Sequence, residues 1–200
     1  MLTVAIQAGG ESRRMGQDKA LLPFLGEPLI VRLIRRLSPV AEQMLITTNF
    51  PADYRFLDVP LFTDVLPGFG ALGGLYSALY WATLPLVAVV ACDMPFANAE
   101  LLAAARDRLL ATNADAVIPQ HEEGFEPFHA VYRRASCLPA VKAALEAGER
   151  RLISWLPAVK VISFSPEEVS QYDPRRLAFW NLNTPQEFRQ AEDLARELKG

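Results

Sequence analysis

The sequence predicts an α/β fold, a single three-layer α/β/α domain built around a mostly parallel sheet. Apolar runs of strand length alternate with segments of helical periodicity along the whole chain. The run Leu86–Cys92 is continuously apolar, which is typical of a parallel strand covered on both faces. With 200 residues, of which 51% are hydrophobic and 22% charged, the chain has the length and composition of one soluble domain.

The first predicted elements surround a glycine pair. Thr3–Ile6 is a short apolar strand that leads into Gly9-Gly10. Apolar side chains then recur at i, i+3, i+4 and i+7, which predicts a helix over Pro28–Leu37. We interpret the basic side chains of this helix as a solvated face rather than an anion site; they belong to Arg32, Arg35 and Arg36.

The later elements continue the alternation. Strands are predicted over Gln43–Thr48, Val59–Thr63, Leu86–Cys92, Ala116–Ile118, Phe128–Tyr132 and Val159–Phe164. Helices are predicted over Gly73–Trp81, Ala99–Leu110, Pro139–Ala147, Leu152–Leu156 and Pro185–Leu198. Ligands of such folds bind beyond the carboxyl ends of the strands. A site is therefore expected among the segments Ala8–Lys19, Asp64–Gly74 and Asp93–Phe96.

Composition and charge argue against several classes of protein. A net charge of −3 disfavours a non-specific nucleic-acid binder. The apolar runs are too short to span a bilayer, and the first ten residues lack the basic region of a secretory signal. We therefore expect a cytoplasmic protein that binds neither nucleic acid nor membrane. The two cysteines and two histidines have no metal-site spacing, whereas a magnesium site built from carboxylates stays open.

The segment Ala8–Lys19 has the features of a phosphate-binding loop. A strand that opens into a glycine pair brings backbone N–H groups close to phosphate oxygens. Arg14 and Lys19 then supply cationic donors, one a planar fork and the other a movable point charge. The spacing is neither that of a Walker A loop nor that of a dinucleotide fingerprint. The alternative interpretation is an exposed basic loop.

A second glycine-rich segment follows Thr63-Asp64. It holds four glycines within seven residues, from Gly68 to Gly74, and leads into a predicted helix. Backbone N–H groups at a helix start favour anions, so the segment is a candidate for ligand contact. A purely structural glycine turn is the alternative.

Asp93 closes the apolar run Leu86–Cys92 and is followed by Met94-Pro95-Phe96. A carboxylate at the carboxyl edge of the sheet is suited to hold Mg²⁺, which prefers one or two carboxylates together with phosphate oxygens. The alternative is a cap for the helix Ala99–Leu110, but Asn98 is better placed for that role. The sequence therefore predicts a metal-binding role for Asp93.

These motifs resemble those of the molybdenum cofactor guanylyltransferases. From Ala8 to Lys19 the chain matches the signature A-G-G-x-S-x-R-M-G-x-D-K at every specified position, and Gly26–Leu29 is similar to the G-x-P-L that follows it. The run ending in Asp93 is similar to the C-D-M-P-F of the same family. The resemblance covers nearly the whole chain and is most specific before about Pro95.

Two residues depart from the family pattern. Gln7 stands where the family usually has leucine. The resemblance implies that this residue contacts the nucleotide through its main chain, which the change leaves intact, and the alternative is an additional contact by the Gln7 side chain. Ala71 replaces the proline of D-x-x-P-G-x-G-P-L-x-G, which makes the loop less rigid without changing its chemistry.

The resemblance implies a Rossmann-like nucleotidyltransferase fold and a Mg²⁺-dependent reaction. GMP would pass from GTP to the phosphate of a molybdenum- or tungsten-pterin cofactor, with release of pyrophosphate. Residues 1–96 of the domain 1–200 would bind nucleotide and metal, and residues 97–200 would form the pterin side and the C-terminal helix. Cofactor-insertion chaperones or apo-molybdoenzymes would be its protein partners.

The resemblance also assigns site residues. Arg14, Lys19 and Asp93 are the expected catalytic residues, with Asp93 as the metal ligand. The pterin side is expected to include Glu126, Asn181 and Asn183. The residues expected to bind nucleotide are Gln7, Ala8, Gly9, Gly10, Arg14, Lys19, Asn49, Asp64 and Asp93.

Alternatives stay open at this point. Asn49 also suits a turn before Pro51, and Asn183 also suits a cap for the terminal helix. A cytidylyltransferase for the same pterin would usually carry A-A-G at Ala8–Gly10, and a sugar-phosphate nucleotidyltransferase a Thr-Arg-Leu run after its glycines. A non-catalytic GTP or pterin carrier would have no use for a metal-binding carboxylate.

Overall fold

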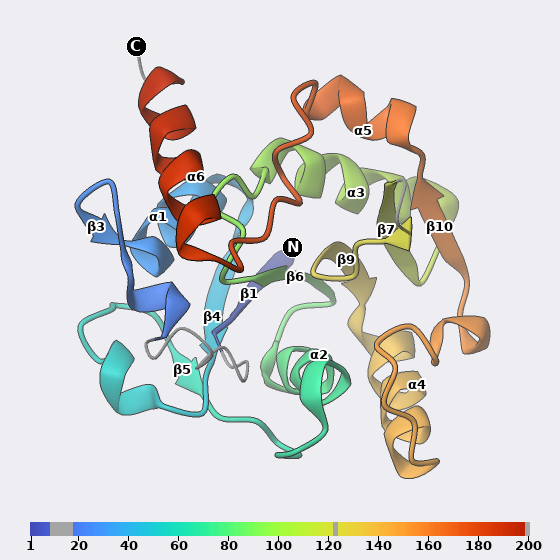
Figure 1. The fold of residues 1–200 in the computed structure, drawn as a ribbon. Helices are drawn as coiled ribbons and strands as arrows, with labels where there is room; N and C mark the ends of the chain where they lie inside the picture. The colour runs from blue at the N-terminus through green and yellow to red at the C-terminus, as the bar shows by residue number, and fades with distance from the viewer. Residues whose placement is uncertain (9–17, 122–123, 199–200) are drawn as a thin grey trace.

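The structure is a computed structural model that describes residues 1–8, 18–121 and 124–198, and it contains a mixed sheet flanked by helices (Figure 1). The strands lie in the order β10-β7-β9-β6-β1-β4-β5, and β8 pairs with β7. Their bounds are β1 Leu2–Gln7, β4 Gln43–Thr47, β5 Leu61–Phe62, β6 Leu86–Ala91, β7 Ala116–His121, β8 Gly124–Phe125, β9 His129–Arg133 and β10 Val161–Phe164. A separate hairpin pairs β2 (Pro23–Phe24) with β3 (Glu27–Pro28).

The sheet is mostly parallel, as predicted. β1 pairs in parallel with β4 and β6, so that Gln7 is level with Thr47 on one side and Ala91 on the other. β5 and β10 are parallel to β4 and β7. β9 is antiparallel to both β6 and β7. The carboxyl ends of β1, β4, β5 and β6 therefore meet at one edge.

Helices cover both faces of the sheet, which confirms the three-layer prediction. In Figure 1, α2 and α4 lie below the sheet and α1 and α3 above it. Val4 and Ile6 of β1 face the layer of α1 and α3, whereas Ala5 faces the layer of α2 and α4. The helix bounds are α1 Leu29–Leu37, α2 Gly70–Trp81, α3 Ala99–Thr112, α4 Arg134–Glu146, α5 Pro166–Tyr172 and α6 Pro185–Glu197.

A third apolar cluster ties the C-terminal segment to the strand edge. The ring of Phe24 in the hairpin makes edge-on contacts with Phe96 and with Phe188 of α6. Phe96 also stacks on Trp180, with ring centroids 5.9 Å apart. Because Phe96 follows Asp93 by three residues, this cluster holds the chain before α6 beside the end of β6.

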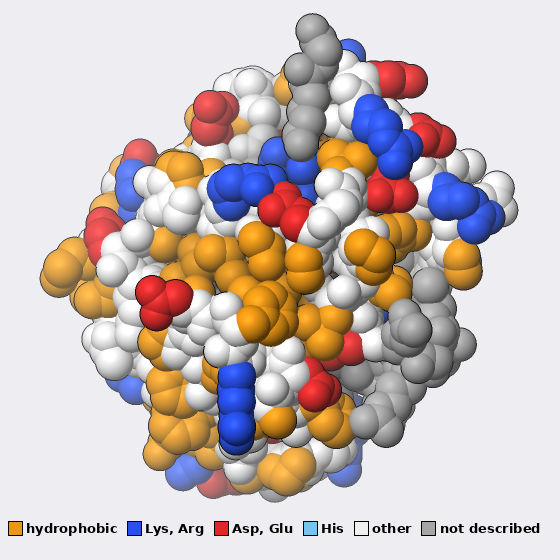
Figure 2. All heavy atoms as spheres, turned by 90° about the vertical axis from the view of Figure 1, so that its left-hand side faces the viewer, with side chains coloured by type: hydrophobic (Ala, Val, Ile, Leu, Met, Phe, Trp, Pro, Cys, Tyr) orange, Lys and Arg blue, Asp and Glu red, His pale blue; other side chains and the backbone are white. Residues whose placement is uncertain are grey.

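The molecular surface next to this cluster is chemically mixed. On the face shown in Figure 2, apolar side chains fill the middle, and basic and acidic side chains alternate around them. No helix in the described ranges has the length and apolar character needed to cross a membrane.

Two predicted helices differ from the structure. Leu152–Leu156 forms turns that lead into a short 3-10 helix, Leu156–Ala158, rather than an α-helix. Helix α4 begins at Arg134, five residues before Pro139, although proline usually lies in a first turn. Contacts with other elements account for the early start, because Arg134 donates its backbone N–H to Pro85 and its side-chain Nε–H to Leu79.

Candidate active site

The ends of the parallel strands bring the predicted nucleotide-binding residues to one edge. The Cys92 N–H donates to the carbonyl of Gln7 at 3.0 Å, and the Ala8 N–H donates to Thr47 at 2.8 Å. Asp93 follows directly on Cys92. The chain thus leaves β1 and β6 side by side, which places Ala8 and Asp93 at neighbouring strand ends.

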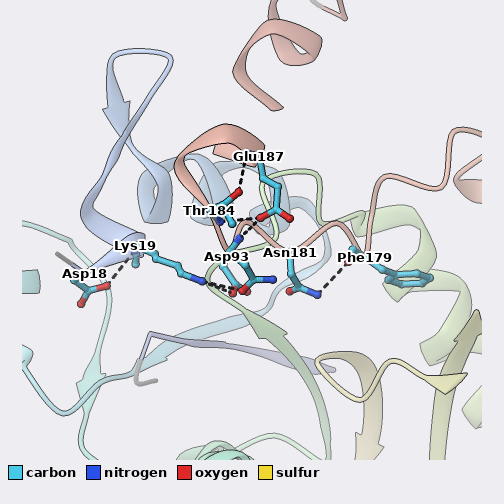
Figure 3. Close-up of polar contacts among 9 residues, drawn as sticks. Asp18, Lys19, Asp93, Phe179, Asn181, Thr184 and Glu187 are labelled. Carbon is cyan, nitrogen blue, oxygen red and sulfur yellow. Dashed lines mark hydrogen bonds and ion pairs between the residues drawn. The ribbon is translucent and has the colours of Figure 1, made fainter. Parts of the chain in front are cut away.

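Lys19 and Asp93 point toward each other at this edge (Figure 3), and Asn183 contacts Lys19 there. The Nζ of Lys19 lies 3.6 Å from a carboxylate oxygen of Asp93 and donates to the Oδ1 of Asn183 at 3.0 Å. Lys19 is only 7% exposed, so its charge is presented in a restricted direction. The structure therefore brings two predicted catalytic residues, Lys19 and Asp93, together with the predicted pterin-side residue Asn183. Lys19 and Asn183 are 164 positions apart in the chain.

Asp18 and Tyr54 hold Lys19 in this position, and sequence reasoning missed both. Asp18 caps the 3-10 helix Lys19–Leu21 by accepting from the Ala20 N–H at 3.0 Å. Its other carboxylate oxygen accepts from the hydroxyl of Tyr54 at 2.6 Å. Tyr54 is fully buried. Asp18 belongs to the signature Ala8–Lys19, and its location directly before Lys19 was the feature of the sequence that could have indicated its role.

Asp93, the predicted metal ligand, is a partly buried carboxylate. Burial raises the pKa of its carboxyl, and the positive charge of Lys19 opposes that increase. Its side chain is 20% exposed, so a ligand can reach it. The described residues contain no group of three or more His, Cys, Asp or Glu that could hold a metal ion. One accessible carboxylate nevertheless fits Mg²⁺, which keeps water and phosphate oxygens as its other ligands.

Asn49 and Asp64 form a reciprocal pair beyond β4 and β5. The Asn49 Nδ2 donates to a carboxylate oxygen of Asp64 at 2.8 Å, and the Asp64 N–H donates back to the Asn49 Oδ1 at 3.3 Å. The following residue, Val65, donates its N–H to the hydroxyl of Ser77 in α2. The pair is therefore attached to the α2 side of the edge. Asn49 also stands just before the 3-10 helix that begins at Pro51, so its nucleotide-binding role stays a prediction.

The expected pterin side contains a pocket of about 490 Å³. Glu126 lies in its wall, and burial raises the pKa of that carboxyl to about 7. The negative charge of Asp93 adds to the increase. Asn181 also lines the pocket, whereas Asn183 does not. The remaining lining residues are Gln120, His121, Pro166, Val169, Arg176, Phe179 and Trp180.

The structure corrects the interpretation of the α1 arginines as a solvated face. Arg32 is 6% exposed, its guanidinium lies over two aromatic rings, and its Nε–H donates to the Pro95 carbonyl at 2.9 Å. Burial lowers its pKa to about 10. Arg36 donates to two carbonyls of the same loop. Only Arg35 is exposed among these three, so the other two serve to fix the loop that follows Asp93.

The N-cap alternatives are also decided by the structure. Thr184 caps α6 and forms a capping box with Glu187, which leaves Asn183 free to contact Lys19. Asn98 caps α3, as expected, so that Asp93 has no capping role there. Gly9, Gly10 and Arg14 lie outside the described residues, and their predicted roles stay predictions.

Comparison with known proteins identifies the family. A profile described as the MobA-like NTP transferase domain matches residues 4–161. The chain belongs to this family. Among curated proteins, a probable molybdenum cofactor guanylyltransferase of Carboxydothermus hydrogenoformans is 36% identical to it, over 94% of this chain and 93% of the relative. A molybdenum cofactor guanylyltransferase of Desulfosudis oleivorans is 32% identical, over 96% and 94%. The resemblance predicted from the signature is thereby confirmed.

Solved structures of similar proteins agree with the fold of this MobA-like nucleotidyltransferase. Molybdopterin-guanine dinucleotide biosynthesis protein A of Archaeoglobus fulgidus superposes with a TM-score of 0.85 at 26% identity, covering 98% of this chain and 99% of the other. A 2-C-methyl-D-erythritol 4-phosphate cytidylyltransferase of Thermus thermophilus superposes with a TM-score of 0.69 at 20% identity, covering 97% and 98%. The second protein shares the fold alone.

Proposed function

We propose that this nucleotidyltransferase transfers GMP from GTP to the phosphate of a molybdenum- or tungsten-pterin cofactor and releases pyrophosphate. The observation that carries the proposal is the contact of Lys19 with both Asp93 and Asn183 at the edge of the sheet. A pocket of about 490 Å³ lies near this contact, because Asn181 in its wall stands two residues before Asn183 and the charge of Asp93 acts on Glu126 in the same wall. The names of the relatives support guanine as the base and the molybdenum cofactor as the acceptor.

Lys19 and Asp93 would divide the work on the triphosphate. The buried ammonium of Lys19 would neutralise phosphate oxygens, because its charge faces the strand edge. Asp93, assisted by water, would hold Mg²⁺, which when bound supplies charge neutralisation to the departing pyrophosphate. Arg14 and the Gly9-Gly10 backbone are proposed to bind the same phosphates. Asn49 and Asp64 are proposed to contact the nucleoside.

Glu126 and Asn181 would bind the pterin. Phe179 and Trp180 add aromatic surface to the same pocket, which suits the stacking of a flat ring. With its pKa raised to about 7, Glu126 can be present as the neutral acid, which both donates and accepts hydrogen bonds. The hydrogen-bonding edge of a pterin offers partners for both functions.

The reaction requires no general base from the protein. A phosphate monoester has a second pKa of about 6, so the acceptor phosphate is already largely dianionic at neutral pH. The residues then have only to orient the attacking oxygen and neutralise charge. We further propose that the protein works in the cytoplasm and passes its product to insertion chaperones or apo-molybdoenzymes.

A turnover assay tests the proposal against its alternatives. Purified protein is mixed with each of the four NTPs, Mg²⁺ and molybdenum- or tungsten-loaded pterin, and pyrophosphate release is measured. GTP should be the preferred substrate, and chelation of Mg²⁺ should stop turnover. Preference for CTP would indicate a cytidylyltransferase for the same pterin, and turnover with a sugar phosphate would indicate a sugar-phosphate nucleotidyltransferase. Tight GTP binding without turnover would indicate a carrier.

A further inference from the structure

The side chain of Gln7 lies at the carboxyl end of β1 and packs against helix α2. Alternation along the strand turns it to the same face as Ala5, which belongs to the α2 layer. Its carboxamide lies directly on Gly74, since a Cβ at that glycine would stand 2.9 Å from Nε2 and 3.0 Å from Oε1 of Gln7. The absence of a side chain at Gly74 is therefore what makes room for this amide.

The Nε2 of Gln7 is buried and has no hydrogen-bond partner in the described part of the chain. Buried amide donors are almost always satisfied, because desolvation without a partner is unfavourable. An apolar side chain of similar shape would fill the same space without that penalty. Gln7 as a residue is only partly buried, so its carboxamide can turn from Gly74 toward the ligand-binding edge of the α/β sheet, where a ligand supplies the missing acceptor.

The position of Gln7 identifies which part of the ligand it meets. The α2 side of the edge carries the neutral amide of Gln7 and, through Val65 and Ser77, the Asn49–Asp64 pair. The opposite side carries the buried charge of Lys19, whose neighbour Ala20 packs in the α1 and α3 layer. A triphosphate belongs near the cation, whereas an uncharged carboxamide is suited to the edge of a base.

We infer that the Gln7 side chain binds the base of the nucleotide, with Nε2 donating to O6 of guanine and Oε1 accepting from its N1–H. This inference rests on the proposed use of GTP and adds a specificity-determining residue to it. Guanine presents O6 as an acceptor, and the adjacent N1–H completes a planar pair with a carboxamide. A base without O6 and N1–H would leave both amide atoms unpaired.

The test compares Gln7→Met with Gln43→Met. Both changes replace a carboxamide in the central sheet by an apolar side chain of similar length. Gln43 lies at the opposite end of β4, and its Oε1 already accepts from Thr3 and Thr83. Thermal melts of the apo protein and calorimetric titrations with Mg-GTP are recorded for wild type and both variants. A third titration uses the triphosphate of 2-aminopurine riboside, which lacks O6 and N1–H.

Gln7→Met should keep or raise the apo melting temperature and raise the Kd for GTP about 10-fold. Gln43→Met should lower the melting temperature and leave the Kd for GTP unchanged, because it removes satisfied hydrogen bonds far from the site. Wild type should bind the 2-aminopurine nucleotide about 10-fold more weakly than GTP, and Gln7→Met should bind the two equally.

Two results overturn the inference. One is an unchanged Kd for GTP in Gln7→Met, and the other is continued discrimination between GTP and the 2-aminopurine nucleotide by that variant. Either result, obtained while wild type turns over GTP, removes only the role of Gln7. If wild type neither binds nor uses GTP, the proposed function fails, and this inference fails with it.

Discussion

Replacing Tyr54 by phenylalanine tests whether the buried chain of contacts behind Lys19 matters for catalysis. The change removes one hydroxyl, which donates to Asp18 at 2.6 Å, and leaves the buried ring in place. Asp18 in turn caps the short helix that begins at Lys19. Without the Tyr54 hydroxyl, one of the two Asp18 carboxylate oxygens loses its hydrogen-bond donor. We therefore expect Asp18, and with it Lys19, to sample other orientations.

The magnitude follows from the type of bond. A buried hydrogen bond to a charged group contributes about 1.5–3 kcal/mol, and for a chain of this size each kcal/mol shifts Tm by about 2–4 °C. Tyr54→Phe should therefore lower Tm by roughly 3–12 °C. Turnover should fall further than stability alone explains, by about 10-fold in kcat, because small displacements of a positioned group reduce rates steeply.

The matched control is Ser136→Ala. Its hydroxyl also donates to a carboxylate oxygen at 2.6 Å, that of Asp115, which directly precedes β7 at the opposite strand edge. This variant should lose some thermal stability and keep its full kcat. Melting curves are recorded for both variants, and steady-state pyrophosphate release is measured at a temperature well below their Tm. If Tyr54→Phe loses stability but keeps wild-type kcat and KM, the hydroxyl is structural and the reasoning about Lys19 is wrong.

Four further predictions concern the site. Asp93→Asn should reduce kcat on the order of 100-fold or more while Tm holds or rises, because burial already disfavours the charged form; turnover and melts check this. Lys19→Ala should weaken GTP binding, and Lys19→Arg should restore only part of it, as titration calorimetry will show. Because the pKa of Glu126 is raised to about 7 in the folded protein, wild type should lose stability as pH rises from about 5 to 8. Glu126→Gln should remove the part of this pH dependence that Glu126 causes, which thermal melts of both proteins at the two pH values will measure. Arg32→Met should raise the KM for GTP several-fold by freeing the loop after Asp93, and an unchanged KM would contradict this role.

The sequence predicts the central sheet well because its signals are local. The apolar runs at Leu86 and before Gly9 are direct consequences of burial on two faces, and both become strands of the sheet. Short irregular elements carry weaker signals. The β2–β3 hairpin and α5 were not predicted, since two-residue strands and a seven-residue helix depend on contacts with the rest of the molecule.

The prediction of the site divides in the same way. Lys19 and Asp93 stand out because each is a charged residue next to a glycine loop or an apolar strand. The buried arginines of α1 were misinterpreted, because helical periodicity places Arg32 on a polar face and cannot show that Phe24 and Phe96 from other segments cover it. Asp18 and Tyr54 were missed for a related reason, since their contact spans 36 positions.

Three consecutive residues before α6 connect the parts of the site. Asn181 lines the proposed pterin pocket, the Leu182 N–H donates to the carbonyl of Asp93 at 2.9 Å, and Asn183 accepts from Lys19. A shift of this segment would therefore move the pocket wall, the backbone of Asp93 and the Asn183 partner of Lys19 together. The proposed reaction requires an acceptor phosphate to reach the α-phosphorus of the nucleotide in line. A short segment that contacts both sides would fix that separation more tightly than two independent loops, which would explain why residues so late in the chain contact a candidate site that begins at the end of β1.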